Sequence, residues 1–103
     1  MTLDPVIHAP NRLQLMSLLY PLTEAEFAFL RDHINVSDSV LSKQAAALES
    51  AGYLEIRKRT LAGRSRTWFS LTEEGRDAFD TYVTHLQALV GRPLRPPLED
   101  RTP

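Results

Sequence analysis

Apolar residues recur at helical spacing in the first third of this 103-residue chain. The first such stretch covers residues 11–19 and follows Pro10, which suits a helix start because its missing N–H would have no partner there. The second follows Thr23-Glu24-Ala25-Glu26, a predicted capping box in which Thr23 and Glu26 satisfy free backbone N–H groups. Its apolar residues share one helical face and are Phe27, Leu30 and Ile34. We expect two short helices here.

A third helix is predicted over residues 37–51, with Ser37 as its N-cap. Gly52 follows, a residue that can take the positive φ with which helices often end. The connection to the second helix is about three residues long, as in a helix-turn-helix. One stripe of this helix is apolar and should face the core: Leu41, Ala45 and Leu48.

The pattern changes to alternation after Gly52, which predicts a strand. In this strand Leu54 and Ile56 share one side, and Arg57 and Arg59 lie on the other. A second strand is expected over residues 67–71, after a polar turn over residues 60–66. Because a two-stranded ribbon alone is marginally stable, it should pack on the helices.

A fourth helix is predicted from Thr72, its N-cap, to Gly91. Glu73 and Glu74 suit the positive end of its dipole. We expect one domain over residues 1–90, including terminal dimerisation elements, and a proline-rich disordered tail over residues 91–103. The expected fold class is α+β, with element order α-α-α-β-β-α.

Charge is unevenly distributed, although the chain carries a net charge of only −1. Residues 53–68 hold five basic side chains against Glu55 alone, a local charge of +4, whereas residues 69–90 sum to −3. Local potential, rather than total charge, steers a polyanion. A helix-turn-helix followed by a cationic hairpin is the plan of a winged helix, in which one helix enters the major groove and the hairpin contacts phosphates.

Several other functions lack the residues they need. The chain has no cysteine, so disulfides and thiolate ligands are excluded. His8, His33 and His85 have no short ligand spacing, so we expect no metal and no cofactor, although His8 and His85 could meet if both terminal elements dimerise. No nucleophile elbow or phosphate loop points to an enzyme. Without a signal sequence or an apolar run of about 20 residues, a cytoplasmic location with no membrane contact is expected.

Four segments in order carry a resemblance to a known family. They are residues Leu3 to Leu13, Val36 to Lys43, Leu48 to Leu54 and Leu71 to Arg76. The chain resembles bacterial winged-helix transcriptional regulators of the MarR and ArsR type, and in particular their short single-domain members, over residues 3–90. The resemblance implies a homodimeric, sequence-specific DNA-binding regulator of a pseudo-palindromic double-stranded operator. A repressor is the favoured form, because repression needs only occupancy of a promoter.

The resemblance also implies which elements meet DNA. The helix over residues 37–51 would read the major groove, and the wing over residues 57–67 would contact the backbone or minor groove. The expected DNA-binding residues are Ser37, Ser39, Ser42, Lys43, Gln44, Arg57, Arg59, Arg64 and Arg66. The expected dimerisation residues are Leu3, Val6, Ile7, Phe79, Tyr82, Val83, Leu86, Leu89 and Val90.

Alternatives remain open at this stage. The polar face of the third helix could be a solvated surface, and Arg57 and Arg59 could pair with Glu55 and Glu73 instead of DNA. Trp68 could stack on a base or, as the favoured interpretation, pack against the protein. The fourth helix could pack on its own domain instead of dimerising. The whole chain could be a protein-interaction module without direct DNA readout, or a sensor controlled by a metal or by a small-molecule effector of unknown identity.

Overall fold

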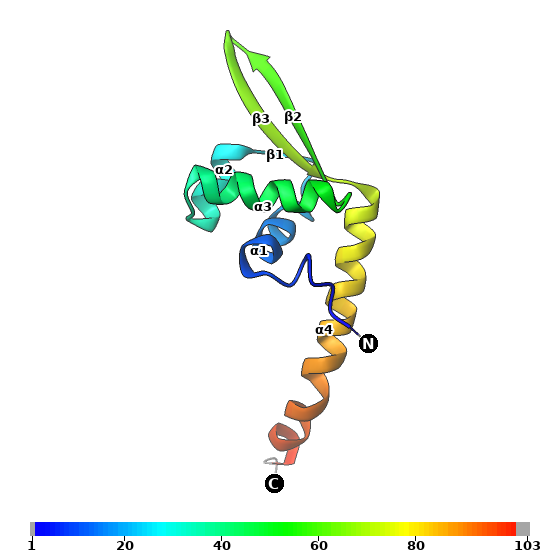
Figure 1. The fold of residues 1–103 in the computed structure, drawn as a ribbon. Coiled ribbons are helices and arrows are strands. Elements are labelled where there is room, and N and C mark those ends of the chain that lie inside the picture. The colour runs from blue at the N-terminus through cyan, green and yellow to red at the C-terminus, as the bar shows by residue number, and fades with distance from the viewer. Residues whose placement is uncertain (1, 101–103) are drawn as a thin grey trace.

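The computed structural model describes residues 2–100, with side chains for residues 2–91. It confirms an α+β winged helix (Figure 1). The elements in chain order are α1 (Pro10–Leu19), β1 (Ala25–Glu26), α2 (Phe27–Ile34), α3 (Asp38–Ser50), β2 (Leu54–Leu61), β3 (Arg64–Leu71) and α4 (Glu73–Asp100). Within residues 2–100, no helix combines the length and the apolarity needed to cross a membrane.

The three strands form one antiparallel sheet in the order β1-β3-β2. The long β2–β3 hairpin is the wing and stands away from the helices (Figure 1). Its turn is only Ala62 and Gly63, at φ 52° and 77°, so the predicted polar turn over residues 60–66 is wrong. Ladder pairing holds these polar residues extended, because both strands of a ribbon can leave their side chains in water.

The predicted capping box before α2 is also wrong. Ala25 is buried and pairs with Phe69, and Glu26 pairs with Trp68, so this segment is the short strand β1. Glu26 becomes the N-cap of α2 without a side-chain capping bond. Burial of Ala25 in the sheet outweighs the local capping preference, which is worth only about 1 kcal/mol.

The core lies between the three short helices, the sheet and the first half of α4. It contains three of the predicted dimerisation residues, since Ile7, Phe79 and Tyr82 are 0%, 9% and 2% exposed. These side chains are already buried within one chain, so their part in a dimer contact stays a prediction. The N-terminal segment and α4 pack on their own domain here, the alternative left open by the sequence.

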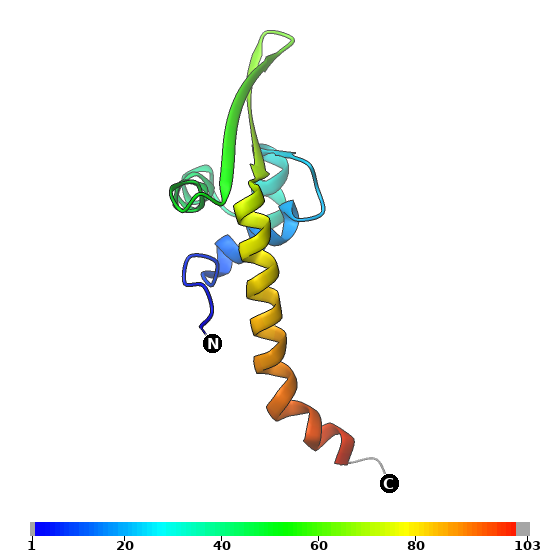
Figure 2. The ribbon, with the colours of Figure 1, turned by 90° about the vertical axis from the view of Figure 1, so that its right-hand side faces the viewer.

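The helix α4 does not end at Gly91 but continues as helical backbone to Asp100. A single glycine costs a helix only about 1 kcal/mol, which does not by itself stop it. Figure 2 shows the last, red part of α4 turning away from the axis of the preceding part, as expected where prolines interrupt the hydrogen-bond ladder. The division into a domain of residues 1–90 and a tail of residues 91–103 stays a prediction, and residues 101–103 lie outside the described residues.

A tight joint connects α3, the wing and α4. Gly52, at φ 83°, ends the α3 segment as predicted, and its carbonyl accepts a hydrogen bond of 2.6 Å from the Thr72 hydroxyl. Thr72 also caps α4, accepting from the Gly75 N–H at 2.9 Å, which confirms its predicted role. Gly75 packs so closely that an added Cβ would lie 2.2 Å from the Tyr53 carbonyl oxygen. This joint fixes α3, the wing and α4 relative to one another.

Candidate nucleic-acid interface

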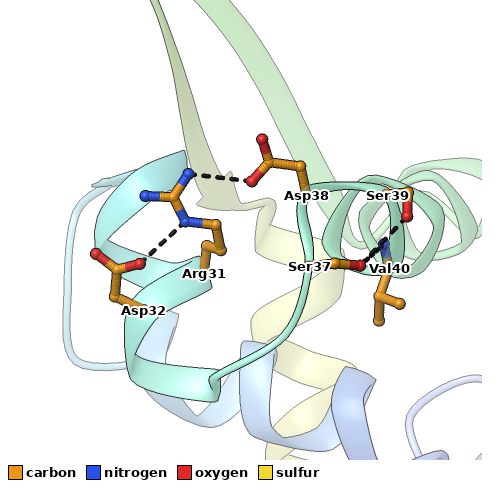
Figure 3. A network of polar contacts seen from close by, with 6 residues as sticks. All are labelled: Arg31, Asp32, Ser37, Asp38, Ser39 and Val40. Atoms are coloured by element: carbon orange, nitrogen blue, oxygen red, sulfur yellow. Dashed lines mark hydrogen bonds and ion pairs between the residues drawn. The ribbon is translucent and has the colours of Figure 1, made fainter.

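The N-terminus of α3 is held by local polar contacts (Figure 3). The Ser37 Oγ accepts a hydrogen bond from the Val40 N–H at 3.2 Å, which confirms the predicted N-cap. Arg31, on α2, donates to Asp32 and to Asp38, each at 3.0 Å. Both hydrogen bonds raise the pKa of Arg31, and the bond to Asp32 has the larger effect. The charge of Arg31 offsets the Asp38 carboxylate at the start of α3.

The outer face of α3 is small and polar. Ser39, Ser42 and Lys43 are exposed there, on the side opposite the buried stripe, as predicted. Gln44 lies apart from them, since its Oε1 accepts a hydrogen bond of 2.9 Å from Arg12. Arg12 also donates to the carbonyls of Pro5 and Val6. Gln44 therefore helps to hold the N-terminal segment, and its role in reading bases stays a prediction.

All four arginines of the wing lie on one face of it. The register pairs Arg57 with Trp68, Arg59 with Arg66, and Leu61 with Arg64. Directly opposed residues of antiparallel strands project to the same side, so these six side chains share one face. We call this the outer face, because Leu54, Ile56, Phe69 and Leu71 of the other face belong to or pack against the core.

Three of the four arginines form ion pairs within the protein. Arg57 pairs with Glu55 at 2.9 Å, one of the alternatives left open by the sequence. Arg59 pairs with Glu24 at 2.8 Å and not with Glu73. The Arg66 Nη1 reaches both carboxylate oxygens of Glu26, at 2.7 and 2.9 Å. Sequence reasoning missed Glu24 and Glu26, because it placed them in a capping box.

Arg64 lies near the wing tip and is exposed. Among the side chains of residues 2–91, it takes part in no ion pair, and the same holds for Lys58 and Lys43. Lys58 lies on the opposite face of the wing from Arg64, since the Lys58–Thr67 pair alternates with the arginine-bearing pairs. Arg64 is thus the wing arginine whose charge is most available to a phosphate.

Trp68 packs against the protein, as the favoured interpretation held. The guanidinium carbon of Arg59 lies 4.4 Å from its ring centroid, within the range of a cation–π contact. Its indole Nε1 is buried and has no hydrogen-bond partner among the described residues. A ring covered in this way presents little face for a nucleic-acid base.

A cavity of about 340 Å³ lies between the N-terminal segment and the first turns of α4. At its wall the Tyr53 hydroxyl donates to Asp4 Oδ2 at 2.6 Å, and this bond, with burial, raises the pKa of Tyr53 to about 12. His85 also lines it, whereas His8 is hydrogen-bonded to the Tyr82 hydroxyl at 2.8 Å. No group of three His, Asp or Glu side chains within residues 2–91 is placed to hold a metal ion.

The helix-turn-helix, the three-stranded sheet and the protruding wing together define a winged helix-turn-helix. A family model described as a winged helix DNA-binding domain matches residues 11–90, and the chain belongs to that family. The chain is also 33% identical to Uncharacterized protein MJ0432 of Methanocaldococcus jannaschii over 84 residues, which is 82% of this chain and 91% of that one.

Solved structures of the MarR and ArsR type share this fold. A transcriptional regulator homologue from Pyrococcus horikoshii OT3 aligns with a TM-score of 0.79 and 24% identity, over 84% of this chain and 85% of that one. The homodimeric winged helix-turn-helix domain of Mb0332 from Mycobacterium bovis aligns at 0.67 and 20%, over 85% and 79%. The transcriptional repressor BigR from Xylella fastidiosa aligns at 0.63 and 25%, over 82% and 79%. The family and fold are those of DNA-binding transcriptional regulators and not of enzymes.

Proposed function

We propose that this protein is a homodimeric transcriptional regulator that binds a pseudo-palindromic operator and acts as a repressor. The helix α3 enters the major groove with Ser39, Ser42 and Lys43, and the wing lies along the backbone or the adjacent minor groove. BigR, a protein of similar fold, is a transcriptional repressor. Occupancy of a promoter by this compact domain is sufficient for repression.

The observation that carries this proposal is the arginine face of the wing beside a polar recognition helix. Arg57 and Arg64 supply positive charge that no core contact requires, on an exposed hairpin. Small hydroxyls on α3 let the helix approach base edges closely, and serine can hydrogen-bond to any of several of them. Phosphate attraction then supplies affinity, and the helix supplies register and sequence preference.

The dimer contact is proposed for the part of α4 around residues 86–90. Leu89 and Val90 are 56% and 47% exposed, and Leu86 is only partly buried. This part of the helix extends beyond the rest of the domain (Figure 1). A symmetric partner helix would bury these side chains, as two-fold operators also favour. The Mb0332 domain of similar fold is described as homodimeric.

An effector is the remaining partner in the proposal. The cavity between the N-terminal segment and α4 is bounded by Asp4, Glu74 and Asp77, so it would favour a cationic or hydrogen-bond-donating small molecule. NadR of similar fold was solved with 4-hydroxyphenylacetate, which is an anion. The carboxylates of this cavity would repel such a ligand, so a different chemical class is proposed here.

The test is a binding titration with a labelled fragment of the DNA upstream of the protein's own gene. Salt concentration is varied, and shuffled DNA of equal length serves as competitor. With three to five phosphate contacts per subunit, the slope of log K against log salt should be about −5 to −9 for the dimer. Sedimentation measures the oligomeric state of the same sample. Absence of binding at low salt by a folded dimer would overturn the proposal.

A second candidate is a protein-interaction module, favoured by the single cation on the outer face of α3, Lys43. Such a module would bind its partner with little dependence on salt and would not need a cationic wing. The same titration separates the two functions, because only DNA binding falls steeply as salt rises.

A further inference from the structure

Two arginines of the wing repel each other. Arg59 and Arg66 face each other directly across β2 and β3, on the outer face. Like charges at directly opposed positions destabilise a strand pair. Beyond its base, the wing is a two-stranded ribbon, which is marginally stable without further support. The wing therefore needs something at this level to offset the repulsion.

Two carboxylates from one segment supply that support. Glu26, in β1, forms an ion pair with Arg66 on β3. Glu24, just before β1, forms an ion pair with Arg59 on β2. Backbone pairing of β1 with β3 reaches only Trp68 and Phe69. The two ion pairs therefore connect the β1 segment to both strands of the hairpin, nearer to the wing tip than the backbone pairing reaches.

We infer that Glu24, Glu26, Arg59 and Arg66 form a brace that sets the position of the wing relative to α3. We call these four residues the wing brace. They are positioning residues, and the DNA contacts of the wing then belong to Arg57 and Arg64. This inference rests on the proposed function and refines it, since it removes two arginines from the predicted DNA-binding set and adds two glutamates that favour binding.

Arg59 and Arg66 differ from Arg57 in their ion-pair partners and in their exposure. Among the described side chains, Arg57 pairs only with Glu55 of its own strand, two residues away, so this contact does not connect the wing to another element. Arg59, by contrast, has Glu24 on one side and the Trp68 ring 4.4 Å away. In Arg66, one guanidinium nitrogen is shared by both oxygens of Glu26. Both arginines are less exposed than Arg57, at 45% and 42% against 66%.

Removing the charge of Glu26 should change DNA affinity in the direction opposite to the usual one. Neutralising a carboxylate beside a DNA-binding surface ordinarily strengthens DNA binding, because one repulsion is removed. If Glu26 acts through the brace, Glu26→Gln should instead weaken binding, by about fivefold. The matched control is Glu55→Gln on the same face, which should leave binding equal or tighter.

The decisive variant exchanges the charges. Glu26→Arg combined with Arg66→Glu restores the ion pair with the opposite orientation and leaves net charge unchanged. A brace predicts affinity within about twofold of the natural protein, whereas Arg66→Gln alone stays weak. The single variants Glu26→Arg and Arg66→Glu complete the double-mutant cycle, which isolates the pair. If the exchange variant binds as weakly as Arg66→Gln, or if Glu26→Gln binds more tightly than the natural protein, the inference is wrong.

A readout without DNA keeps the inference separate from the proposed function. Trp68 is the single tryptophan of the chain and lies against Arg59. Acrylamide quenching of its emission should rise in the Glu24→Gln, Glu26→Gln double variant and return to the natural value on charge exchange. A natural protein that binds no DNA would overturn the proposed function, and unchanged quenching in the double variant would overturn the brace.

Discussion

The outer face of α3 and the outer face of the wing differ in charge, support and side-chain size. The helix presents short hydroxyls and Lys43, on a backbone held by the buried residues Leu41 and Leu48. The wing presents four long arginines on a ribbon that extends beyond the core. Rigid placement suits hydrogen bonds to base edges, and long charged side chains suit phosphates, which tolerate imprecise positions. The difference supports the proposed division, in which α3 supplies specificity and the wing supplies affinity.

This division depends on the joint that holds both regions, so breaking the joint should have the largest effect. In Gly75→Ala, the new Cβ would lie 2.2 Å from the Tyr53 carbonyl oxygen, a backbone atom that cannot move cheaply. We expect a loss of about 3 kcal/mol or more in the free energy of unfolding, measured by urea denaturation. Operator affinity should fall with it, because α3 and the wing lose their common support.

The control for this prediction is Gly63→Ala at the wing tip. A Cβ there meets nothing within 4 Å, and only the positive φ of 77° opposes it. Its cost should be about 1 kcal/mol. Equal losses in the two variants would contradict the close packing at Gly75.

Removing charge from the wing should have the next largest effect. In the double variant Arg57→Gln, Arg64→Gln, a dimer loses four predicted phosphate contacts. The expected result is a loss of roughly 100- to 1,000-fold in affinity near physiological salt, for operator and shuffled DNA alike, and a salt slope flatter by about 3 to 4 units. Fluorescence anisotropy against salt measures both quantities.

Lys58→Gln is the matched control, because it removes one positive charge from the opposite face of the same hairpin. Its effect on affinity should be smaller than that of either single arginine variant. If Lys58→Gln flattens the salt slope as much as Arg64→Gln does, the assignment of DNA binding to the outer face fails.

Substitutions on α3 should change preference more than overall affinity. Ser42→Ala removes a hydroxyl donor from the outer face of the helix, and Lys43→Gln removes the positive charge there. At a base that is read, the expected change in discrimination is about 1–3 kcal/mol, with little effect on shuffled DNA. Competition with operators altered one base pair at a time measures it. Uniform loss on every sequence would show that the α3 contacts are to phosphates instead.

The sequence predicted the helices and the wing well, because these depend on local periodicity and capping. Ser37, Gly52 and Thr72 act as expected, since each satisfies or ends a backbone pattern set by its neighbours. The alternation of β2 also placed Arg57 and Arg59 on one face before any register was known.

The sequence could not predict contacts between distant segments. The strand β1 has two residues, too few for any periodicity, and it forms because Ala25 meets Phe69 from 44 positions away. The pairs of Glu24 and Glu26 with the wing follow from that register. Burial of Ile7 and Tyr82 likewise depends on how the N-terminal segment lies on α4, which apolarity alone does not distinguish from a dimer interface.

The smallest predicted effect concerns Tyr53, which lies between α3 and β2 and belongs to neither outer face. Its hydroxyl donates to Asp4 at 2.6 Å, and the bond raises the pKa of Tyr53 from 10.0 to about 12. A raised pKa in the folded state means that this stabilisation is complete below pH 10 and is lost as pH rises through 10 to about 12. Tyr53→Phe should therefore lower the free energy of unfolding by about 1 kcal/mol at pH 7 and reduce its decline across that pH range.

Because the bond holds the N-terminal segment and neither outer face, Tyr53→Phe should change operator affinity at neutral pH less than twofold and leave the salt slope intact. Thermal unfolding between pH 7 and 12 provides the stability measurement, with Asp4→Asn as the partner variant. Parallel pH profiles for the natural protein and Tyr53→Phe would show that another group causes the alkaline loss. A changed salt slope would mean that the N-terminal segment helps to position the wing, and the two-region division of affinity and specificity would then need a third region.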